Sequence, residues 1–461
     1  MDKLTVRQLL EAVDGALLGS FDDLDAAVDS VTTDSRSTPE GCLFIPLQGE
    51  RFDGHAFIQS ALEGGAAGCL TARERDSYLP GKFYIRVRST HQALRDLARY
   101  YRRTFDIPFI AVTGSVGKTT AKDMIAAVLG ARYQVHKTDG NYNNDIGVPL
   151  TLLKLERRHQ VCVVEMGMDH AGEIDRLGAL VEPDMAVVTN IGDAHIENLG
   201  SRENIFKAKS EIFPHLKPDG AAILNGDDEW LSTLRGKLPQ KTLFVGKGEG
   251  LDYTAFDIES EAASIRCGIR TPRSQFQADI PALGEHMIYP TLIAAAAGEE
   301  LGMGPDEIAR GIGAFLPTKM RMNILRCAGD LVILNDCYNA NPQSMRAAAA
   351  VLGGAAHRRK VAVLGDMKEL GPNSEQFHRA VGEFFAQAGC DRLIAIGDLA
   401  RFMAEGAKAA GLEQTAYFPT VEEAKEALLR EVRAGVTILV KASRSMAFER
   451  VVEFLQENIP E

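Results

Sequence analysis

One short segment carries the residue types that bind the phosphates of a nucleotide. It lies between an apolar, strand-like run at 109–113 and a helical pattern at 119–129, and it reads Thr113, Gly114, Ser115, Val116, Gly117, Lys118, Thr119 and Thr120. Glycines let backbone N–H groups curve around phosphate oxygens, and a helix N-terminus adds positive potential. We expect Lys118 to reach the β- and γ-phosphates and Thr119 to ligate Mg²⁺. Val112 replaces the usual first glycine, which leaves the shorter spacing G-x-x-G-K-T.

Two further candidates follow strand-like runs. Glu165 ends the apolar run 161–165, and His195 follows the run 186–191. The carboxyl ends of parallel strands meet at one edge of an α/β sheet, where binding sites assemble. We therefore expect Glu165 to hold Mg²⁺ beside the phosphates and His195 to lie on the same rim, although a salt-bridged strand end and a structural histidine are the alternatives. For Lys209, a solvated surface lysine is the simpler interpretation of the residues alone.

Composition describes an ordinary globular chain. The 461 residues are 45% hydrophobic and 25% charged, and roughly 150 residues per domain predicts about three domains. The net charge of −12 disfavours bulk binding to nucleic acid or to an anionic membrane. The seven cysteines are scattered, no secretory signal is visible, and no apolar run approaches the ~18 residues of a membrane span. We expect a cytoplasmic protein without membrane insertion.

Strand-like and helical runs alternate in two long regions, which predicts βαβ units around parallel sheets. In the first region we expect strands at 109–113, 161–165, 186–191, 221–225 and 242–245, an antiparallel addition at 252–280, and helices at 119–129, 202–213, 286–301 and 306–315. In the second we expect strands at 331–335, 361–364, 393–396 and 438–440, and helices at 342–352, 374–388, 399–409, 421–433 and 445–455. The predicted fold is α/β with three domains: a small α/β domain at 1–106, a central P-loop mononucleotide-binding parallel sheet at 107–316, and a Rossmann-like domain at 317–461.

Taken together, these residues resemble the Mur ligase family of ATP-dependent amide-bond-forming enzymes, over essentially the whole chain. Residues 113–120 are similar to its T-G-S-x-G-K-T loop, and 141–149 to an asparagine-rich segment that faces substrate. Glu165 and His195 fall where the family places magnesium ligands. Lys209 falls where several members carry a carbamylated lysine, so the resemblance implies a metal set of Thr119, Glu165, His195 and, if carbamylated, Lys209.

Three further segments resemble the branch of this family that joins D-alanyl-D-alanine to UDP-N-acetylmuramoyl-tripeptide. They are 33–36 with 49–55, 335–345, and 365–371 with His378 after them. The resemblance implies that residues 1–106 hold the UDP end of the substrate, with the binding candidates Thr33, Asp34, Ser35, Arg36, Arg51, Asp53, Asn143 and Asn144. It also implies that residues 317–461 bind the incoming amine and close over ATP. This closure would bring the ATP-binding candidates Arg321, Asp336 and Asn339 toward the nucleotide.

Two departures from the family pattern stand out. A common H-N-x-x-N pattern, whose asparagine helps to hold adenine, is replaced by His286-Met287-Ile288-Tyr289-Pro290. A K-G-S-R segment becomes Lys441-Ala442-Ser443-Arg444.

The activity that the resemblance implies has two steps. ATP phosphorylates the terminal carboxylate of the tripeptide, and the amine of D-alanyl-D-alanine then displaces phosphate from the acyl phosphate. ATP and Mg²⁺ are the expected cofactors, and a monomer is the expected state. Two alternatives remain from the residues: another ATP-dependent ligase on this scaffold, such as one that extends folate with glutamate, and a nucleotide-driven switch that makes no bond. The third residue of the tripeptide is lysine or diaminopimelate, and the sequence leaves both open.

Overall fold

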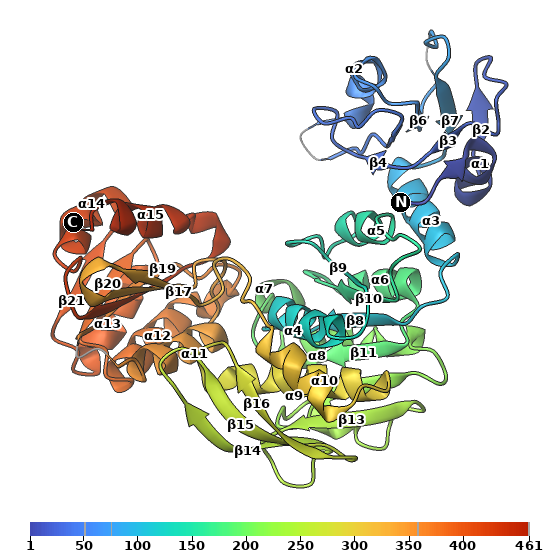
Figure 1. Ribbon diagram of the computed structural model, residues 1–461. Helices are drawn as coiled ribbons and strands as arrows, with labels where there is room; N and C mark the ends of the chain where they lie inside the picture. The colour runs from blue at the N-terminus through green and yellow to red at the C-terminus, as the bar shows by residue number, and fades with distance from the viewer. Residues whose placement is uncertain (50–51, 75, 357–358, 460–461) are drawn as a thin grey trace.

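The computed structural model describes residues 1–49, 52–74, 76–356 and 359–459. Three main sheets follow one another along the chain and form three parts, which Figure 1 shows in blue, in green to yellow, and in orange to red. No strand pairing in the described part of the chain crosses residue 106 or residue 316. The three-domain α/β fold predicted from the sequence is confirmed.

The N-terminal part has a five-stranded sheet in the order β2-β7-β6-β5-β4 and a two-stranded sheet of β1 and β3. Its strands are β1 (Leu4–Thr5), β2 (Ala16–Leu18), β3 (Ala27–Val28), β4 (Val31–Thr32), β5 (Leu43–Phe44), β6 (Gly68–Thr71) and β7 (Phe83–Arg86). Its helices are α1 (Val6–Val13), α2 (Ile58–Glu63) and α3 (Thr90–Arg102). The Ser89 hydroxyl caps α3, whose apolar side packs on α1 and on the central part of the molecule. Helix α3 therefore joins the first two domains.

The central part is a nine-stranded sheet in the order β16-β15-β14-β13-β12-β11-β8-β10-β9. Its strands are β8 (Phe109–Thr113), β9 (Val135–Lys137), β10 (Val161–Glu165), β11 (Met185–Val188), β12 (Ala221–Asn225), β13 (Lys241–Gly246), β14 (Tyr253–Ser260), β15 (Ile265–Arg270) and β16 (Gln275–Ile280). The strands from β9 to β14 pair in parallel, and β14, β15 and β16 pair antiparallel. Every residue of β8 and β10 is buried, because helices cover both faces of the sheet.

Helices divide between the two faces of this sheet. Ile110 and Val112 of β8 share a core with α4 (Lys118–Gly130), α9 (Ile288–Glu300) and α10 (Pro305–Gly313). Phe109 and Ala111 point to the other face, toward α3, α5 (Gly147–Leu152), α6 (Glu173–Val181) and α8 (Arg202–Ser210). The short α7 (Ile196–Leu199) lies just before α8.

The C-terminal part is a six-stranded sheet in the order β17-β18-β22-β19-β20-β21. Its strands are β17 (Asn323–Cys327), β18 (Leu331–Asn335), β19 (Arg359–Gly365), β20 (Arg392–Ile396), β21 (Thr415–Phe418) and β22 (Val436–Lys441). The helices α11 (Pro342–Gly353), α12 (Ser374–Gln387) and α13 (Ala400–Ala409) cover one face, and α14 (Val421–Leu429) and α15 (Glu449–Glu457) cover the other. All its strands pair in parallel except β17, which is antiparallel to β18.

The sequence missed β9, β17 and β21, which lie at or near sheet edges. They are short and only partly buried, so they carry no continuous apolar run. Strand β11 ends at Val188 rather than at 191, because Thr189 and Asn190 turn away to bind a neighbouring loop. The predicted helix 445–455 instead begins at Glu449, after a 3₁₀ turn.

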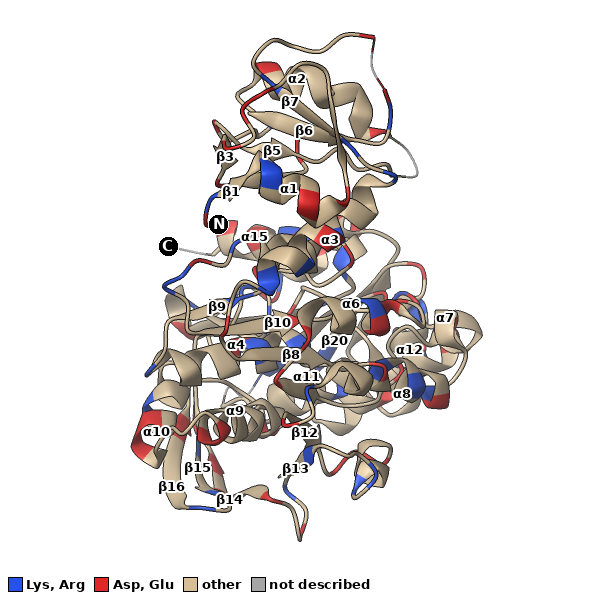
Figure 2. Cartoon of the chain, turned by 90° about the vertical axis from the view of Figure 1, so that its right-hand side faces the viewer, with Lys and Arg blue, Asp and Glu red and all other residues tan. Residues whose placement is uncertain are grey.

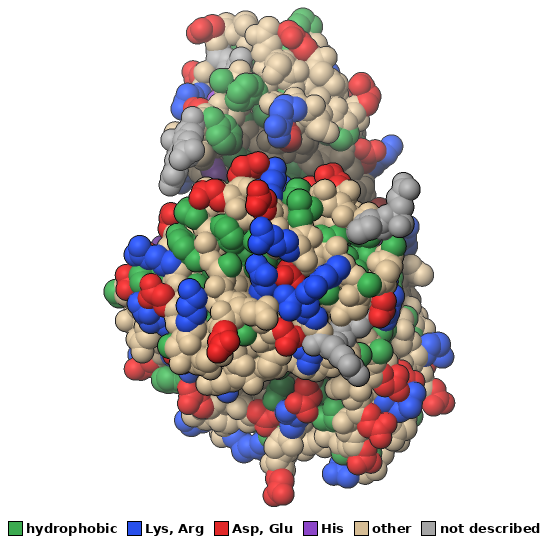
Figure 3. All heavy atoms as spheres, turned by 90° about the vertical axis from the view of Figure 1, so that its left-hand side faces the viewer, with side chains coloured by type: hydrophobic (Ala, Val, Ile, Leu, Met, Phe, Trp, Pro, Cys, Tyr) green, Lys and Arg blue, Asp and Glu red, His purple; other side chains and the backbone are tan. Residues whose placement is uncertain are grey.

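Charged side chains are spread over the whole molecule. Figure 2 shows acidic and basic residues intermixed along all three parts, and Figure 3 shows the same mixture on the opposite face, with basic side chains gathered near its centre. Most of the net charge of −12 nonetheless belongs to the central part, since residues 107–316 hold 29 acidic and 20 basic side chains. Within the described ranges, no helix has both the length and the apolar character needed to span a bilayer.

Candidate active site

The predicted phosphate loop connects β8 to α4 and is held by the residues that follow β11. The backbone N–H of Val116 donates to Asn190 Oδ1 at 3.0 Å, and the Val116 carbonyl accepts from the Thr189 hydroxyl at 2.6 Å. Gly114 has a φ of 144°, and a Cβ there would lie 1.9 Å from Thr189 Oγ1. Gly117 has a φ of 84°, immediately before the first residue of α4. Both glycines are thus required by the conformation of the loop.

Lys118 is the first residue of α4 and points back over the loop. Its Nζ donates to the carbonyls of Gly114 at 2.8 Å and Ser115 at 3.4 Å. Its pKa lies below its ordinary value because burial disfavours the charged form, while Glu165 acts in the opposite sense. A lysine beside a helix N-terminus and glycine backbone is a binding site for phosphate oxygens.

Glu165 ends β10 and is only 2% exposed. Its Oε1 accepts from Asn143 Nδ2 at 2.8 Å and from the Thr119 hydroxyl at 3.2 Å, as the prediction of a shared site requires. Its Oε2 has no hydrogen-bond partner among the described residues, and the nearest charge is Lys122 Nζ at 3.8 Å. A carboxylate beside a threonine hydroxyl, with one oxygen still free, is an oxygen ligand set that fits Mg²⁺.

Lys122, which the sequence analysis missed, lies beneath this carboxylate. It is 2% exposed, and its Nζ donates to the carbonyl of Thr138 at 2.8 Å. It also lies 3.4 Å from Asp123, which in turn binds Lys137 at 2.7 Å. A charged pair inside an otherwise apolar helix, at Lys122 and Asp123, was the signal available in the sequence. The positive charge of buried Lys122 therefore partly offsets the negative charges of Asp123 and Glu165.

A cluster of three side chains surrounds the predicted histidine. His195 Nδ1 lies 3.1 Å from Asp169 Oδ1 and 3.0 Å from Glu369 Oε2, although neither contact has hydrogen-bond geometry. Potential ligand atoms of the three residues lie within 4.8 Å of one another, so the cluster could hold a cation. Burial and then Lys118 lower the pKa of His195 to about 4, which keeps the imidazole neutral and able to ligate. Glu369 comes from the C-terminal domain, so this cluster joins two domains.

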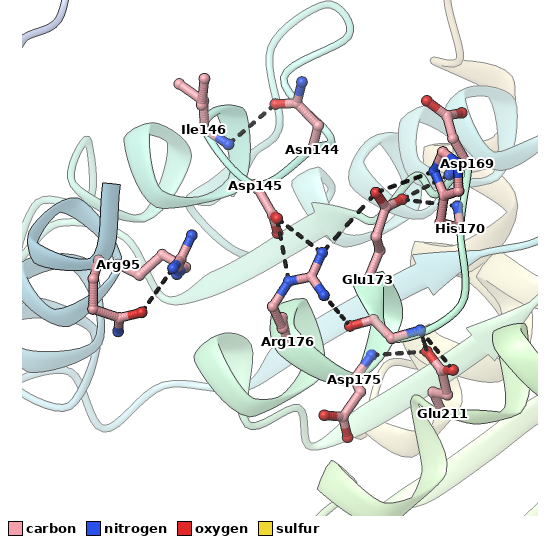
Figure 4. Close-up of polar contacts among 12 residues, drawn as sticks. Arg95, Asn144, Asp145, Ile146, Asp169, His170, Glu173, Asp175, Arg176 and Glu211 are labelled. Carbon is pink, nitrogen blue, oxygen red and sulfur yellow. Dashed lines mark hydrogen bonds and ion pairs between the residues drawn. The ribbon is translucent and has the colours of Figure 1, made fainter. Parts of the chain in front are cut away.

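The loop that presents Asp169 is fixed by a chain of polar contacts, which Figure 4 shows. Glu173 accepts from the backbone N–H of Asp169 at 2.7 Å. Arg176 donates to Asp145 Oδ2 at 3.2 and 3.1 Å, and Glu211 accepts from the backbone N–H of Asp175 at 3.2 Å. These contacts connect the asparagine-rich loop, the start of α6 and the end of α8.

Lys209 lies inside the molecule, only 1% exposed, so the interpretation as a solvated surface lysine is wrong. Burial and then the charge of Lys118 place its pKa well below the ordinary value. Burial therefore favours the neutral form of this amine.

One cavity of about 820 Å³ joins most of these groups and has walls from all three domains. The predicted residues that line it are Ser115, Val116, Gly117, Lys118, Thr119, Thr120, Asn143, Asn144, Glu165, His195, Arg321 and Asn339. Further lining residues that the sequence analysis did not assign include His91, Arg95, Asp169, Glu173, Lys368, Glu369 and Arg444. Thr113, Gly114 and Lys209 lie behind the walls.

A smaller cavity of about 100 Å³ adjoins the phosphate loop and contains Asp336. Its walls are largely apolar, and include Leu283, Met287 and Phe315. Asp336 Oδ2 accepts from Lys441 Nζ at 2.5 Å. The guanidinium of Arg321, which borders both cavities, lies 4.0 Å from the centre of the Tyr338 ring. An apolar recess beside a phosphate loop suits the flat ring of a nucleotide base.

The N-terminal candidates lie outside both cavities, so the structure does not bring them to the phosphate loop. They are Thr33, Asp34, Ser35, Arg36 and Asp53, and Arg51 lies outside the described residues. Arg36 donates to Asp34 at 2.9 and 2.8 Å, which lowers the pKa of Asp34 to about 2. Asp53 pairs with Arg73 at 2.6 Å and with His55 Nδ1 at 2.7 Å. Their role in binding substrate stays a prediction.

Family profiles match three successive parts of the chain. The Mur ligase family catalytic domain matches residues 27–102, the Mur ligase middle domain matches 112–298, and the Mur ligase glutamate ligase domain matches 320–444. The chain belongs to the Mur ligase family.

Individual relatives cover the whole chain. A protein of Bacillus subtilis named UDP-N-acetylmuramoyl-tripeptide--D-alanyl-D-alanine ligase is 39% identical over 460 residues, with 99% of both chains covered. A solved structure of UDP-N-acetylmuramoylalanyl-D-glutamyl-2,6-diaminopimelate--D-alanyl-D-alanyl ligase from Acinetobacter baumannii is 33% identical, with a TM-score of 0.88 and 99% of both chains covered. MurF ligase from Thermotoga maritima in complex with ADP is 29% identical, with a TM-score of 0.83, 93% of this chain and 97% of that chain covered.

Proposed function

We propose that this chain is an ATP-dependent ligase that adds D-alanyl-D-alanine to UDP-N-acetylmuramoyl-tripeptide, and so makes the pentapeptide precursor of peptidoglycan. The observation that carries this proposal is the 820 Å³ cavity, in which a phosphate loop faces an acidic and amide-lined wall between three domains. Full-length similarity to ligases of this name supports the substrate pair.

The reaction needs two anions to meet. A carboxylate oxygen of the tripeptide attacks the γ-phosphorus of ATP, and ADP leaves. The amine nitrogen of D-alanyl-D-alanine then attacks the acyl carbon, the bond to phosphate breaks, and the amine loses a proton. Lys118 and the loop N–H groups would hold the phosphates and offset their charge, so positioning and electrostatics supply most of the catalysis.

Residues of the site also fit a magnesium ion. Thr119 and Glu165 would hold Mg²⁺ at the phosphates, where the metal would neutralise developing charge. His195, Asp169 and Glu369 form a second candidate group beside buried Lys209. A neutral amine is the form that reacts with CO₂, so Lys209 could form a carbamate with loss of one proton, and this would turn it into an anionic ligand.

In this proposal each of the three domains, with boundaries at 106 and 316, has a separate role. Residues 1–106 hold the UDP end, and binding energy there helps to position the distant carboxylate. The apolar recess near Asp336 takes the adenine, and closure of residues 317–461 excludes water from the acyl phosphate. Seven free cysteines and the use of ATP fit a cytoplasmic enzyme, and a monomer stays a prediction.

The test is phosphate release from ATP in the presence of UDP-N-acetylmuramoyl-tripeptide, with and without D-alanyl-D-alanine. Release that requires both substrates, with a pentapeptide product by mass spectrometry, is the expected result. Release with folate and glutamate instead would identify the folate-extending alternative. Release that requires neither acceptor would remove the ligase and favour the nucleotide switch.

A further inference from the structure

The tripeptide named for the Acinetobacter relative keeps carboxylates that do not react. A glutamyl residue linked through one of its two carboxylates retains the other, and diaminopimelate linked through one amine and activated at one carboxylate retains a second carboxylate. Each free carboxylate carries a negative charge into the cavity, which also holds Glu165, Asp169 and Glu369. Such a substrate needs a cation that is not occupied by the phosphates or by another acid.

The basic side chains that line the large cavity differ in whether they already pair with an acidic side chain. Lys368 donates to Asp366 at 2.9 Å, and Arg444 donates to Glu449 at 2.9 and 2.8 Å. The phosphate loop uses Lys118.

Arg321 stacks on Tyr338 and also borders the smaller cavity. Arg95 has no acidic partner among the described residues, and its guanidinium donates only to the amide oxygen of Gln92, at 2.7 Å. An arginine bonded to a neutral amide keeps its charge and most of its donors available.

The position of Arg95 in the cavity also suits a role in binding the substrate away from Asp169. It projects from α3, the helix that joins the first two domains, and Figure 4 shows its side chain on the opposite side of Asp145 from Asp169. The charge of Asp145 is already offset by Arg176. His91 lines the cavity one turn earlier on α3, and burial, with Arg95, holds its pKa below the ordinary value, so it offers a neutral N–H.

We propose that Arg95, assisted by His91, binds a carboxylate of the tripeptide that does not take part in the reaction. This inference rests on the proposed function and adds to it a residue that selects the peptide. A planar guanidinium accepts a carboxylate with two parallel hydrogen bonds, which fixes the orientation of the peptide as well as its presence. The carboxylate is that of the glutamyl residue or the far end of diaminopimelate.

The test measures the Kd of UDP-N-acetylmuramoyl-tripeptide without ATP, by calorimetry, for two forms of the peptide that carry lysine or diaminopimelate. Arg95→Ala should raise the Kd about tenfold, the loss expected for hydrogen bonds to one charged group. Arg95→Lys should recover only part of the affinity, because an ammonium lacks the planar pair of donors. A loss for both peptides would assign the glutamyl carboxylate, and a loss for the diaminopimelate peptide alone would assign the third residue.

A matched control is available on the same helix. Arg103 at the end of α3 pairs with Glu182 and does not line the cavity, so Arg103→Ala should leave both Kd values unchanged. Equal Kd values for the wild type and Arg95→Ala with both peptides would overturn the inference.

The same experiment separates this inference from the proposed function. If the wild type binds neither peptide, the proposed function itself fails. If the wild type binds them and makes the pentapeptide, but Arg95→Ala has the same Kd values, only the role of Arg95 fails. Thermal unfolding of each variant would show that α3 remains folded.

Discussion

The central domain and the N-terminal domain present their candidate residues in opposite ways. Around the phosphate loop, Glu165 and Lys122 are almost completely buried, and Glu165 keeps one oxygen without a hydrogen bond. In the N-terminal domain, the exposed Arg36 and the half-buried Asp34 bind each other. A buried charge with an unused lone pair is costly, whereas an exposed pair between near neighbours costs little.

This difference indicates two ways of handling a ligand. The phosphate loop is built before the ligand arrives, since its glycines, Thr189 and Asn190 already fix the backbone. The N-terminal segment has to exchange one of its own ion pairs for a contact with substrate, so each residue there contributes less. We therefore expect substitutions in the central domain to reduce turnover strongly and those in the N-terminal domain to change mainly the KM.

The largest effect should follow Lys118→Ala. Removal of the amine that lies over the phosphate loop should lower kcat by at least about a thousandfold, because the charge transferred with the phosphoryl group loses its nearest counterion. Steady-state phosphate release measures this, and circular dichroism should show an intact fold. Activity near that of the wild type would contradict the assignment of the loop.

The next effect should follow Lys209→Ala. If Lys209 works as a carbamate, the variant should lose most of its activity and should recover part of it when a short carboxylic acid is added, because the acid replaces the missing carboxylate. Activity is measured over a range of acid concentrations. Lys207→Ala is the control, since Lys207 is exposed on the same helix and pairs with Glu203. No recovery at any concentration would count against the carbamate.

Lys122→Met tests whether a cation that never touches the cavity supports the site. Loss of the charge leaves Glu165 and Asp123 without their buried partner, so the free energy of unfolding should fall by about 3 kcal/mol. Activity should fall roughly 10-fold or more through the displaced carboxylate. Urea unfolding and phosphate release measure the two effects.

Lys137→Met provides the comparison for Lys122→Met. Lys137 also pairs with Asp123, but its side chain is 42% exposed, so its loss should cost about 1 kcal/mol or less. Equal losses of stability in the two variants would show that burial does not distinguish the two lysines.

A smaller effect is expected for Arg36→Ala in the N-terminal domain. The KM for the UDP substrate should rise a few-fold while kcat stays the same, because the residue is exposed and does not line the large cavity. Arg7→Ala, which removes another exposed arginine of the same domain, is the control. An unchanged KM would make Arg36 an ordinary residue of a surface turn.

The smallest effect is expected for His378→Gln, which should change the pH dependence of stability and not the activity. His378 is fully buried outside the cavity, where its Nε2 accepts from the backbone N–H of Met367 at 3.0 Å. Burial lowers its pKa below 6.5, so the unfolded chain takes up a proton first, and stability is lost as the pH falls below about 6.5. In His378→Gln this part of the pH dependence should disappear, as urea unfolding at neutral and mildly acidic pH would show. An identical pH dependence in both proteins would contradict a neutral His378.

The sequence was sufficient for the parts of the site that follow from local rules. The apolar strand before Gly114 and the strand that ends at Glu165 are buried on both faces of the sheet, so their patterns identified them and the edge where they meet. The same rules located His195 on that edge. The loop spacing predicted a phosphate-binding segment without any knowledge of distant contacts.

The rest depended on contacts between distant segments. Glu369 reaches His195 only because the C-terminal domain lies against the central domain, and the interior position of Lys209 depends on how α8 packs on the sheet. Arg95 enters the cavity because α3 packs beside α5 and α6. Edge strands such as β21 lack a buried face, so their residues carry no clear pattern.

The segment between α10 and β17 is an exposed site at which a protease could cut the chain between the central and C-terminal domains. Leu316 within it is 82% exposed, next to Pro317. Proteolytic cleavage at this single leucine would leave the phosphate loop and Glu165 on one fragment and Asp336 with Glu369 on the other. Neither fragment would contain the complete cavity, so the rate at which a protease inactivates the enzyme would report how firmly its ligands hold the two fragments together.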